Sequence, residues 1–142
     1  MKKKLYLVGI FIIAICLLLG LSACSLMQER KYYEEKSNYV EAKGTVAYIS
    51  CDEENKALYI DFSVTEPVFD DTCFKIVGDN YDIVKKNGIN NVLKVGSDVT
   101  FITAPKCFGD GYVMPIVSIS MGEDTFLTFD KGFPNFINWL DS

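Results

Sequence analysis

The pattern of apolar and polar residues divides the chain into three stretches. Residues 5–24 contain no charged side chain, and residues 25–38 are rich in charges of both signs. The rest of the chain alternates between short apolar runs and polar links. An uncharged run of about 20 residues predicts a hydrophobic helix, whereas short alternating runs predict strands. We therefore expect a hydrophobic N-terminal helix, a polar tether that is partly helical, and one small domain over residues 39–142.

The first part of this domain predicts a β-hairpin. Residues 40–51 are extended in pattern and contain Gly44, which predicts a bend or a bulge inside the strand. A polar turn follows, and residues 57–65 then alternate strictly. One face of this second strand is apolar and the other is polar. The apolar face consists of Leu58, Ile60, Phe62 and Val64, and the polar face of Tyr59, Asp61 and Ser63.

The later elements follow from the same patterns. A third strand is expected at residues 72–77, and a short helix then begins at Asp79 or Asn80 and stops at Gly88. Further strands are expected within residues 93–104 and 111–121, with a short sixth strand at 124–129. Pro134 near the start of an amphipathic run predicts a closing helix over residues 133–142.

The order of these elements resembles that of the OB-fold, a partly open five-stranded barrel. The order is three strands, a short helix and two strands, and the interior Gly44 and the run KVGSDVTF at residues 94–101 fit it. The resemblance implies a mainly β fold with short helices, an OB-like β-barrel of five to six strands. It does not specify a function, because this fold has many.

The first 24 residues carry a second resemblance. Met1 is followed by three lysines and the apolar run, which is the layout of a secretory signal. The run ends in Leu21, Ser22, Ala23 and Cys24, which resembles the lipobox of bacterial lipoproteins. This implies a signal peptide at residues 1–23, a diacylglyceryl group on the Cys24 thiol, and a tether at 24–38. The protein would be lipid-anchored on the extracytoplasmic face of the cell membrane. The alternative is an uncleaved single membrane span.

Charge limits the partners of the domain. The chain has 14 basic and 19 acidic residues, and loss of the three lysines before residue 5 leaves 11 basic residues and a net charge of −8. An acidic domain is repelled by nucleic acid and by anionic lipid headgroups. We therefore expect no nucleic-acid partner, attachment to the membrane through the lipid, and a neutral or basic ligand.

The reactive residue types argue against an enzyme. The chain contains no histidine, which excludes Ser-His-Asp and Cys-His arrangements and zinc sites that use histidine. Serine lies in no GxSxG or SxxK motif. Adjacent acidic residues occur only at predicted turns, where solvated caps are typical. We expect no enzymatic activity, no cofactor and no metal.

Three cysteines stay in the domain after Cys16 leaves with the signal peptide and Cys24 carries lipid: Cys51, Cys73 and Cys107. Their spacing matches no metal motif. Outside the cytoplasm two of them could pair, and Cys51 with Cys73 is the preferred pair. The alternative is three unpaired thiols that behave as small apolar side chains.

A ligand site follows from the OB-like resemblance. In such barrels the loop between strands four and five and the loop between strands one and two flank the usual ligand face. This implies ligand contacts from Phe108 and Tyr112 in the first loop, and from Tyr59 and Asp61 on strand two. Aromatic rings beside carboxylates suit sugar or peptide ligands. The alternative is a glycine-rich hairpin whose aromatic rings pack back on the barrel.

The function expected from these features is a binding or accessory module for an envelope protein, peptide or glycan. The alternative is a structural lipoprotein that docks onto a larger membrane complex. A concave polar and aromatic groove would favour the first function, and a flat exposed apolar patch would favour the second.

Overall fold

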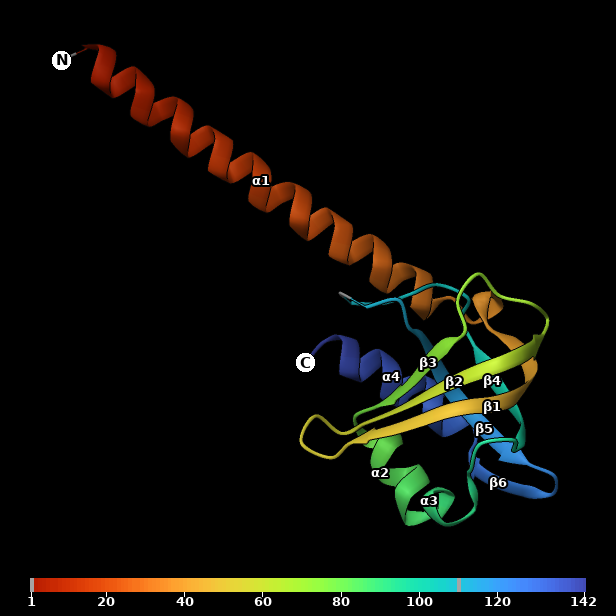
Figure 1. The fold of residues 1–142 in the computed structure, drawn as a ribbon. Helices are drawn as coiled ribbons and strands as arrows, with labels where there is room; N and C mark the ends of the chain where they lie inside the picture. The colour runs from red at the N-terminus through yellow and green to blue at the C-terminus, as the bar shows by residue number, and fades with distance from the viewer. Residues whose placement is uncertain (1, 110) are drawn as a thin grey trace. The chain divides into compact units, whose positions relative to one another are not determined.

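The computed structural model describes residues 2–109 and 111–142, without the side chains of Lys2, Leu5 and residues 21–25. The chain forms two compact units, residues 1–34 and residues 35–142. The first unit is the helix α1 (Lys2–Glu34), and the second contains the β-sheet and the shorter helices (Figure 1).

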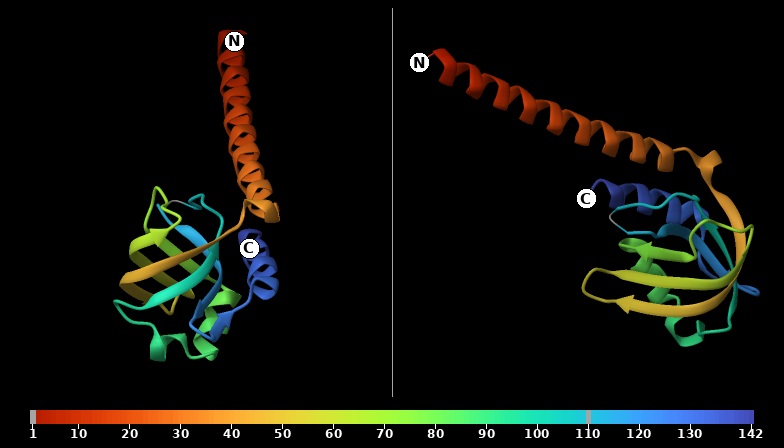
Figure 2. Two further views of the ribbon diagram at one scale, coloured as in Figure 1. Left: turned by 90° about the vertical axis from the view of Figure 1, so that its right-hand side faces the viewer. Right: turned by 45° about the horizontal axis from the view of Figure 1, so that its top comes forward.

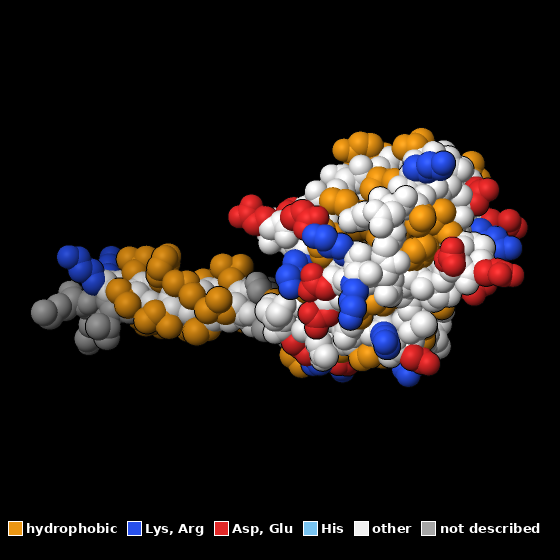
Figure 3. All heavy atoms as spheres, turned by 90° about the horizontal axis from the view of Figure 1, so that it is seen from below, with side chains coloured by type: hydrophobic (Ala, Val, Ile, Leu, Met, Phe, Trp, Pro, Cys, Tyr) orange, Lys and Arg blue, Asp and Glu red, His pale blue; other side chains and the backbone are white. Residues whose placement is uncertain are grey.

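Helix α1 is continuous through the apolar run and most of the predicted tether. Its large apolar side chains between Tyr6 and Leu19 are exposed, and they cover the rod in Figure 3. An ion pair at i,i+4 spacing joins Arg30 to Glu34 at 3.0 Å. Over the side chains that are described, no helix combines the length and the apolar character needed to cross a membrane. The predicted lipidation site, Cys24, lies outside the described side chains.

Over its described residues, the second unit is mainly β, as predicted, with six strands and short helices. Its elements in chain order are η1 (Lys36–Asn38), β1 (Val40–Asp52), β2 (Ala57–Glu66), β3 (Cys73–Val77), α2 (Asp79–Lys86), α3 (Ile89–Val92), β4 (Asp98–Thr103), β5 (Met114–Met121), β6 (Asp124–Leu127) and α4 (Phe129–Leu140).

The sheet closes on itself. The strand order is β3-β2-β1-β4-β5-β6, and β3 also pairs with β5. All pairs are antiparallel except the last, in which Phe74 lies opposite Met114 and Lys75 opposite Pro115 in parallel register. Five strands therefore form a ring, and β6 extends the sheet beside the second half of β5 (Figure 2).

Aromatic side chains fill the inside of this ring. Phe62 stacks on Phe101 with ring centroids 4.8 Å apart, and Phe74 meets both rings edge to face. All three are almost fully buried. A Cβ atom on Gly44 would lie 2.6 Å from the ring of Phe62. Because Gly44 in β1 has no side chain, the ring of Phe62 can occupy this space in the aromatic core.

The alternation predicted for the second strand holds as far as Phe62 and then fails. Val64, expected in the core, is 66% exposed, and the next residue, Thr65, is buried instead. The pairing of β1 with β2 shifts register between Thr45 and Tyr48. Such irregularities insert an extra residue and reverse the faces of the strand beyond them.

Helix α4 begins at Phe129, four residues before the predicted start, and packs directly on the backbone of β5. A Cβ atom on Gly132 would lie only 1.8 Å from the carbonyl oxygen of Val117. The buried amide of Asn80 in α2 donates to the carbonyl oxygen of Gly132 at 2.8 Å and accepts from Asn135 at 3.0 Å. We call these four residues the α4 seat. Pro115, Ile116 and Val117 are all buried, although successive strand residues face opposite sides of a sheet. Ile116 belongs to the core inside the ring, and Val117 lies under α4.

Candidate functional site

Two of the predicted ligand residues lie on neighbouring positions of the outer face of β2 and β3. Tyr59 is opposite Lys75 across the two strands, and Asp61 is opposite Cys73. All four side chains are partly exposed. The Nζ atom of Lys75 lies 5.0 Å from the ring centroid of Tyr59 and 5.9 Å from that of Trp139. Both distances are typical of cation–π contacts.

Phe108, which was predicted to contact a ligand, is buried in this structure. Phe108 is 3% exposed, and its ring lies 5.3 Å from that of Phe136 and 5.6 Å from that of Trp139. Helix α4 offers an apolar surface, and the ring is buried against it. Tyr112, on the same loop, is 82% exposed and keeps the accessibility that a ligand contact needs.

Lys75 and Trp139 belong to this face but were not predicted as part of it. Lys75 was detectable, because it occupies an outward position of the third strand, as Tyr59 does on the second. Trp139 was not, because its place depends on how α4 docks. A Cβ atom on Gly78 would lie 2.6 Å from Cδ1 of this indole, so the ring fits against bare backbone.

A cavity of about 500 Å³ opens between two loops of the second unit. One wall is formed by residues 67–71 of the β2–β3 loop, and the other by residues 105–107 of the β4–β5 loop. We call it the loop cavity. It is lined by the apolar residues Val40, Pro67, Val68, Phe69, Pro105 and Met114, and by Asp70, Asp71, Lys106 and Cys107.

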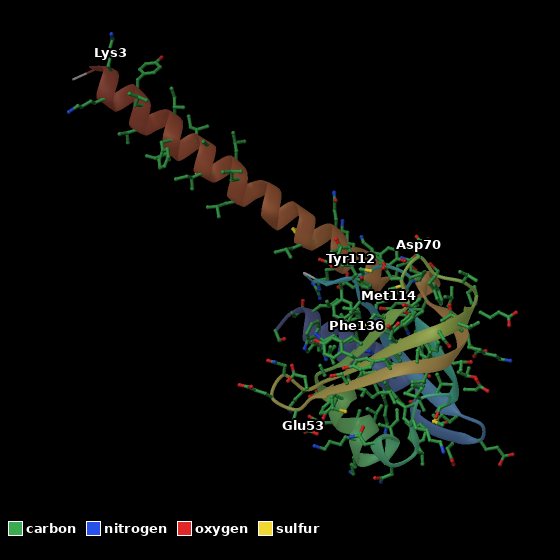
Figure 4. The ribbon with its side chains drawn as sticks, viewed as in Figure 1. Lys3, Glu53, Asp70, Tyr112, Met114 and Phe136 are labelled. Carbon is green, nitrogen blue, oxygen red and sulfur yellow. The ribbon has the colours of Figure 1, made fainter. Side chains whose placement is uncertain are left out.

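The loop cavity uses one of the two loops expected to flank a ligand. In the view of Figure 4, Asp70, Met114 and Tyr112 gather at one end of the domain, away from Glu53 in the β1–β2 turn. That turn is held against α2 instead. Glu53 pairs with Lys85, and Lys56 pairs with Asp82 at 2.7 Å. The second wall of the cavity is therefore the β2–β3 loop.

Charge inside the loop cavity is mixed, with more acid than base. The Cys107 thiol donates a hydrogen bond to Oδ2 of Asp71 at 3.1 Å. Burial and this carboxylate raise the pKa of Cys107 to about 11, so the thiol stays protonated near neutral pH. A protonated thiol is a poor nucleophile. The apolar walls and the carboxylates are suited to holding a ligand.

The predicted bridge between Cys51 and Cys73 does not form in this structure, where both thiols are free. Cys51 lies opposite Leu58 and Cys73 opposite Asp61, on the two strands that flank β2. Three residues along β2 and two strand spacings put their Cα atoms about 14 Å apart. A disulfide needs Cα atoms within about 7 Å. Cys51 is near the end of β1 and Cys73 is at the start of β3, and these two positions are too far apart for a bridge.

No set of three acidic or cysteine side chains is placed to hold a metal ion within the described part of the chain. Comparisons with protein-family models, with curated proteins and with solved structures found no match to this chain. The function is therefore inferred from the geometry of the loop cavity and of the neighbouring outer face.

Proposed function

We propose that this protein is a lipid-anchored module of the extracytoplasmic face of the cell membrane, and that its loop cavity binds a neutral or basic peptide segment of an envelope partner. The observation that carries the proposal is the cavity itself. Its volume of about 500 Å³ lies within the range of about 300–1,000 Å³ typical of ligand pockets. It combines apolar walls with a few charged groups that would fix the orientation of a ligand.

The chemistry of the walls supports a peptide rather than a flat protein surface as the ligand. Val68, Phe69 and Met114 offer apolar contacts, and Asp70 and Asp71 offer carboxylates to a lysine or arginine side chain. The chain is acidic overall, so long-range attraction also favours a neutral or basic partner. On the face drawn in Figure 3, acidic and basic side chains are interspersed, so specificity would come from the cavity rather than from a single charged patch.

An OB-like β-barrel is the fold we propose for the second unit. Support comes from the strand ring β1-β2-β3-β5-β4, the parallel β3–β5 pairing and the helices between β3 and β4. OB-type barrels bind ligands with the loops at the ends of their strands. The β4–β5 loop would have that role here.

The lipid anchor is proposed from the resemblance of residues 21–24 to a lipobox. The exposed apolar side chains of α1 support it, because such a surface needs either a membrane or removal with a signal peptide. Two acyl chains bind a membrane firmly, at about 0.8 kcal/mol per buried CH₂.

The anchor is tested by mass spectrometry of the protein extracted from membranes. We expect a mature chain that begins at Cys24 and carries a diacylglyceryl group. Cys24→Ala should abolish both lipid and cleavage, whereas Cys16→Ala is the matched control and should leave both unchanged. A wild-type chain that retains residues 1–23 would overturn the proposed anchor and favour the uncleaved span.

The ligand is tested with two fluorescent octapeptides, one rich in lysine and one rich in glutamate, titrated against the full chain in detergent. The lysine peptide should bind at least about ten times more tightly at low salt, and added salt should reduce the difference. Asp70→Asn should weaken its binding several-fold, while the control Asp124→Asn on β6 should not. Equal binding of both peptides, or equal effects of both variants, would refute the proposed site.

A further inference from the structure

Two of the free thiols come together at the edge of the loop cavity. Phe74 lies opposite Met114 in the parallel pairing of β3 and β5, so Cys73, at the start of β3, and Val113, just before β5, are also neighbours. The backbone amide of Phe108 donates to the carbonyl oxygen of Val113 at 3.1 Å. Cys73 and Cys107 thus lie on either side of a single residue, Val113.

Side-chain contacts place the two thiols in one environment as well. Asp71, two residues before Cys73, accepts the hydrogen bond from Cys107 at 3.1 Å. Burial and then this carboxylate raise the pKa of Cys107. Burial and then Asp61 raise the pKa of Cys73, and Asp71 adds a smaller contribution of the same sign. Cys51 lies at the far end of β1, where its thiol donates a hydrogen bond to Oδ1 of Asn90 at 3.9 Å.

We propose that Cys73 and Cys107 form a disulfide bond that ties the β4–β5 loop to the start of β3 and fixes one edge of the loop cavity. Gly109 and Gly111 follow Cys107 in the loop, and glycine lets the backbone adjust enough for the sulfur atoms to meet. The inference rests on the proposed function in one respect, the extracytoplasmic location. The environment there is oxidising, so disulfides form and persist.

The reaction needs an oxidant of the disulfide class, for which glutathione disulfide serves as the probe. One protein thiol loses its proton and attacks a glutathione sulfur, which breaks that S–S bond, releases one glutathione thiol and leaves a mixed disulfide. The second protein thiol then attacks the protein sulfur of the mixed disulfide and releases the second glutathione. The protein loses two electrons and two protons, and glutathione disulfide gains them.

Asp71 controls the rate of this exchange in the proposal. Its carboxylate holds the Cys107 proton in a hydrogen bond, and only the deprotonated thiol attacks a disulfide. Asp71→Asn removes the negative charge and should speed bridge formation several-fold at neutral pH. Asp124→Asn, on β6, is the control and should leave the rate unchanged.

The test uses the full chain with Cys16→Ser and Cys24→Ser, so that only the three domain thiols can react. After exposure to glutathione disulfide, alkylation and peptide mapping should find Cys73 linked to Cys107 and Cys51 without a protein partner. The bridge closes a loop of about 35 residues and should raise the melting temperature by about 10 °C.

Two further variants sharpen the result. Cys51→Ser should leave the bridge and its effect on melting unchanged, whereas Cys107→Ser should stop the reaction at a mixed disulfide with glutathione. Glutathione on both Cys73 and Cys107, or a linked peptide that contains Cys51, would overturn the proposal. Because Cys24 is absent from this protein, failure of the bridge is distinguishable from failure of the proposed anchor.

Discussion

The α4 seat and the loop cavity lie on the same small domain and are built in opposite ways. In the seat, helix and strand approach so closely that only a glycine fits at residue 132, and the buried amide of Asn80 bridges two positions of α4. In the loop cavity, two loops leave a space of about 500 Å³, and Val68 in its wall is 88% exposed.

The difference separates residues that hold the fold from residues free to serve a ligand. A contact at close-packing distance transmits any change of volume to its neighbours. A change of volume at an exposed wall is not transmitted in this way, so side chains there can vary with the ligand at little cost to stability. Substitutions in the seat should therefore cost stability, and substitutions in the cavity should alter binding with little cost.

The largest effect is expected from Gly132→Ala. The added Cβ atom would lie 1.8 Å from the carbonyl oxygen of Val117, and backbone cannot move away as a side chain can. We expect a loss of about 3 kcal/mol or more in unfolding free energy, measured by urea denaturation. Gly111→Ala in the β4–β5 loop is the control, because its Cβ atom would meet only Val113 Cγ2, at 3.6 Å. Similar losses in both variants would contradict the comparison.

Asn80→Ala should have the next largest effect. It removes the hydrogen bond to the carbonyl oxygen of Gly132 and leaves the Asn135 amide without its acceptor on Asn80. A loss of about 2 kcal/mol is expected, because the groups left behind are at least partly buried. Asn55→Ala at the exposed β1–β2 turn removes the side-chain hydrogen bond to Asp52 at 2.8 Å and keeps the backbone one, and it should cost less than half as much. If Asn55→Ala lowers the unfolding free energy more than Asn80→Ala does, the special role of the α4 seat is refuted.

Raising the pH should lower the free energy of unfolding by less than these two substitutions do. The folded-state pKa of Cys107 is raised from 9.0 to about 11, so the folded state keeps this thiol protonated after the unfolded state has begun to lose its proton. The stabilisation is complete below pH 9 and is lost as pH rises through about 11. In the reduced protein, Cys107→Ser should lose less stability than the parent between pH 8.5 and 10.5. Parallel pH profiles would show that the thiol does not contribute.

The smallest effect is expected from Val68→Ser in the loop cavity. The side chain is 88% exposed, so unfolding free energy should change by no more than about 0.5 kcal/mol. Val84→Ser is the opposite control, because Val84 is fully buried in α2 and its loss should cost several times more. The exposed variant should instead weaken binding of the lysine peptide. A large stability loss at Val68 would mean that the cavity wall is part of the core.

Much of the fold was predictable from periodicity. The alternation in residues 57–62 identifies the buried face of β2, and Gly88 marks the end of α2 because it adopts a left-handed conformation with φ of 85°. Both signals are local, so they do not depend on how distant parts of the chain pack. Val64 was predicted wrongly because a register shift depends on the partner strand, which a single-strand pattern does not contain.

The candidate site was less predictable, for the same reason. Tyr59 and Asp61 follow from alternation, but the fate of Phe108 depends on α4, about 30 residues later in the chain. Nothing in the sequence near residue 108 distinguishes a ligand contact from a packing contact. The cysteine pairing failed because it requires the positions of β1 and β3 on either side of β2, whereas the sequence gives only their order.

The parallel pairing of β3 with β5 also has a consequence for how the chain folds. Its partners Phe74 and Met114 are 40 positions apart in sequence, whereas β1 and β2 are joined by a four-residue turn. Entropy opposes long-range closure until other contacts offset it. We therefore expect the β1–β2 hairpin to form early and the ring to close late. Until then, the apolar faces of Phe74 and Ile116 are exposed together, and the half-folded chain is at its most vulnerable to aggregation.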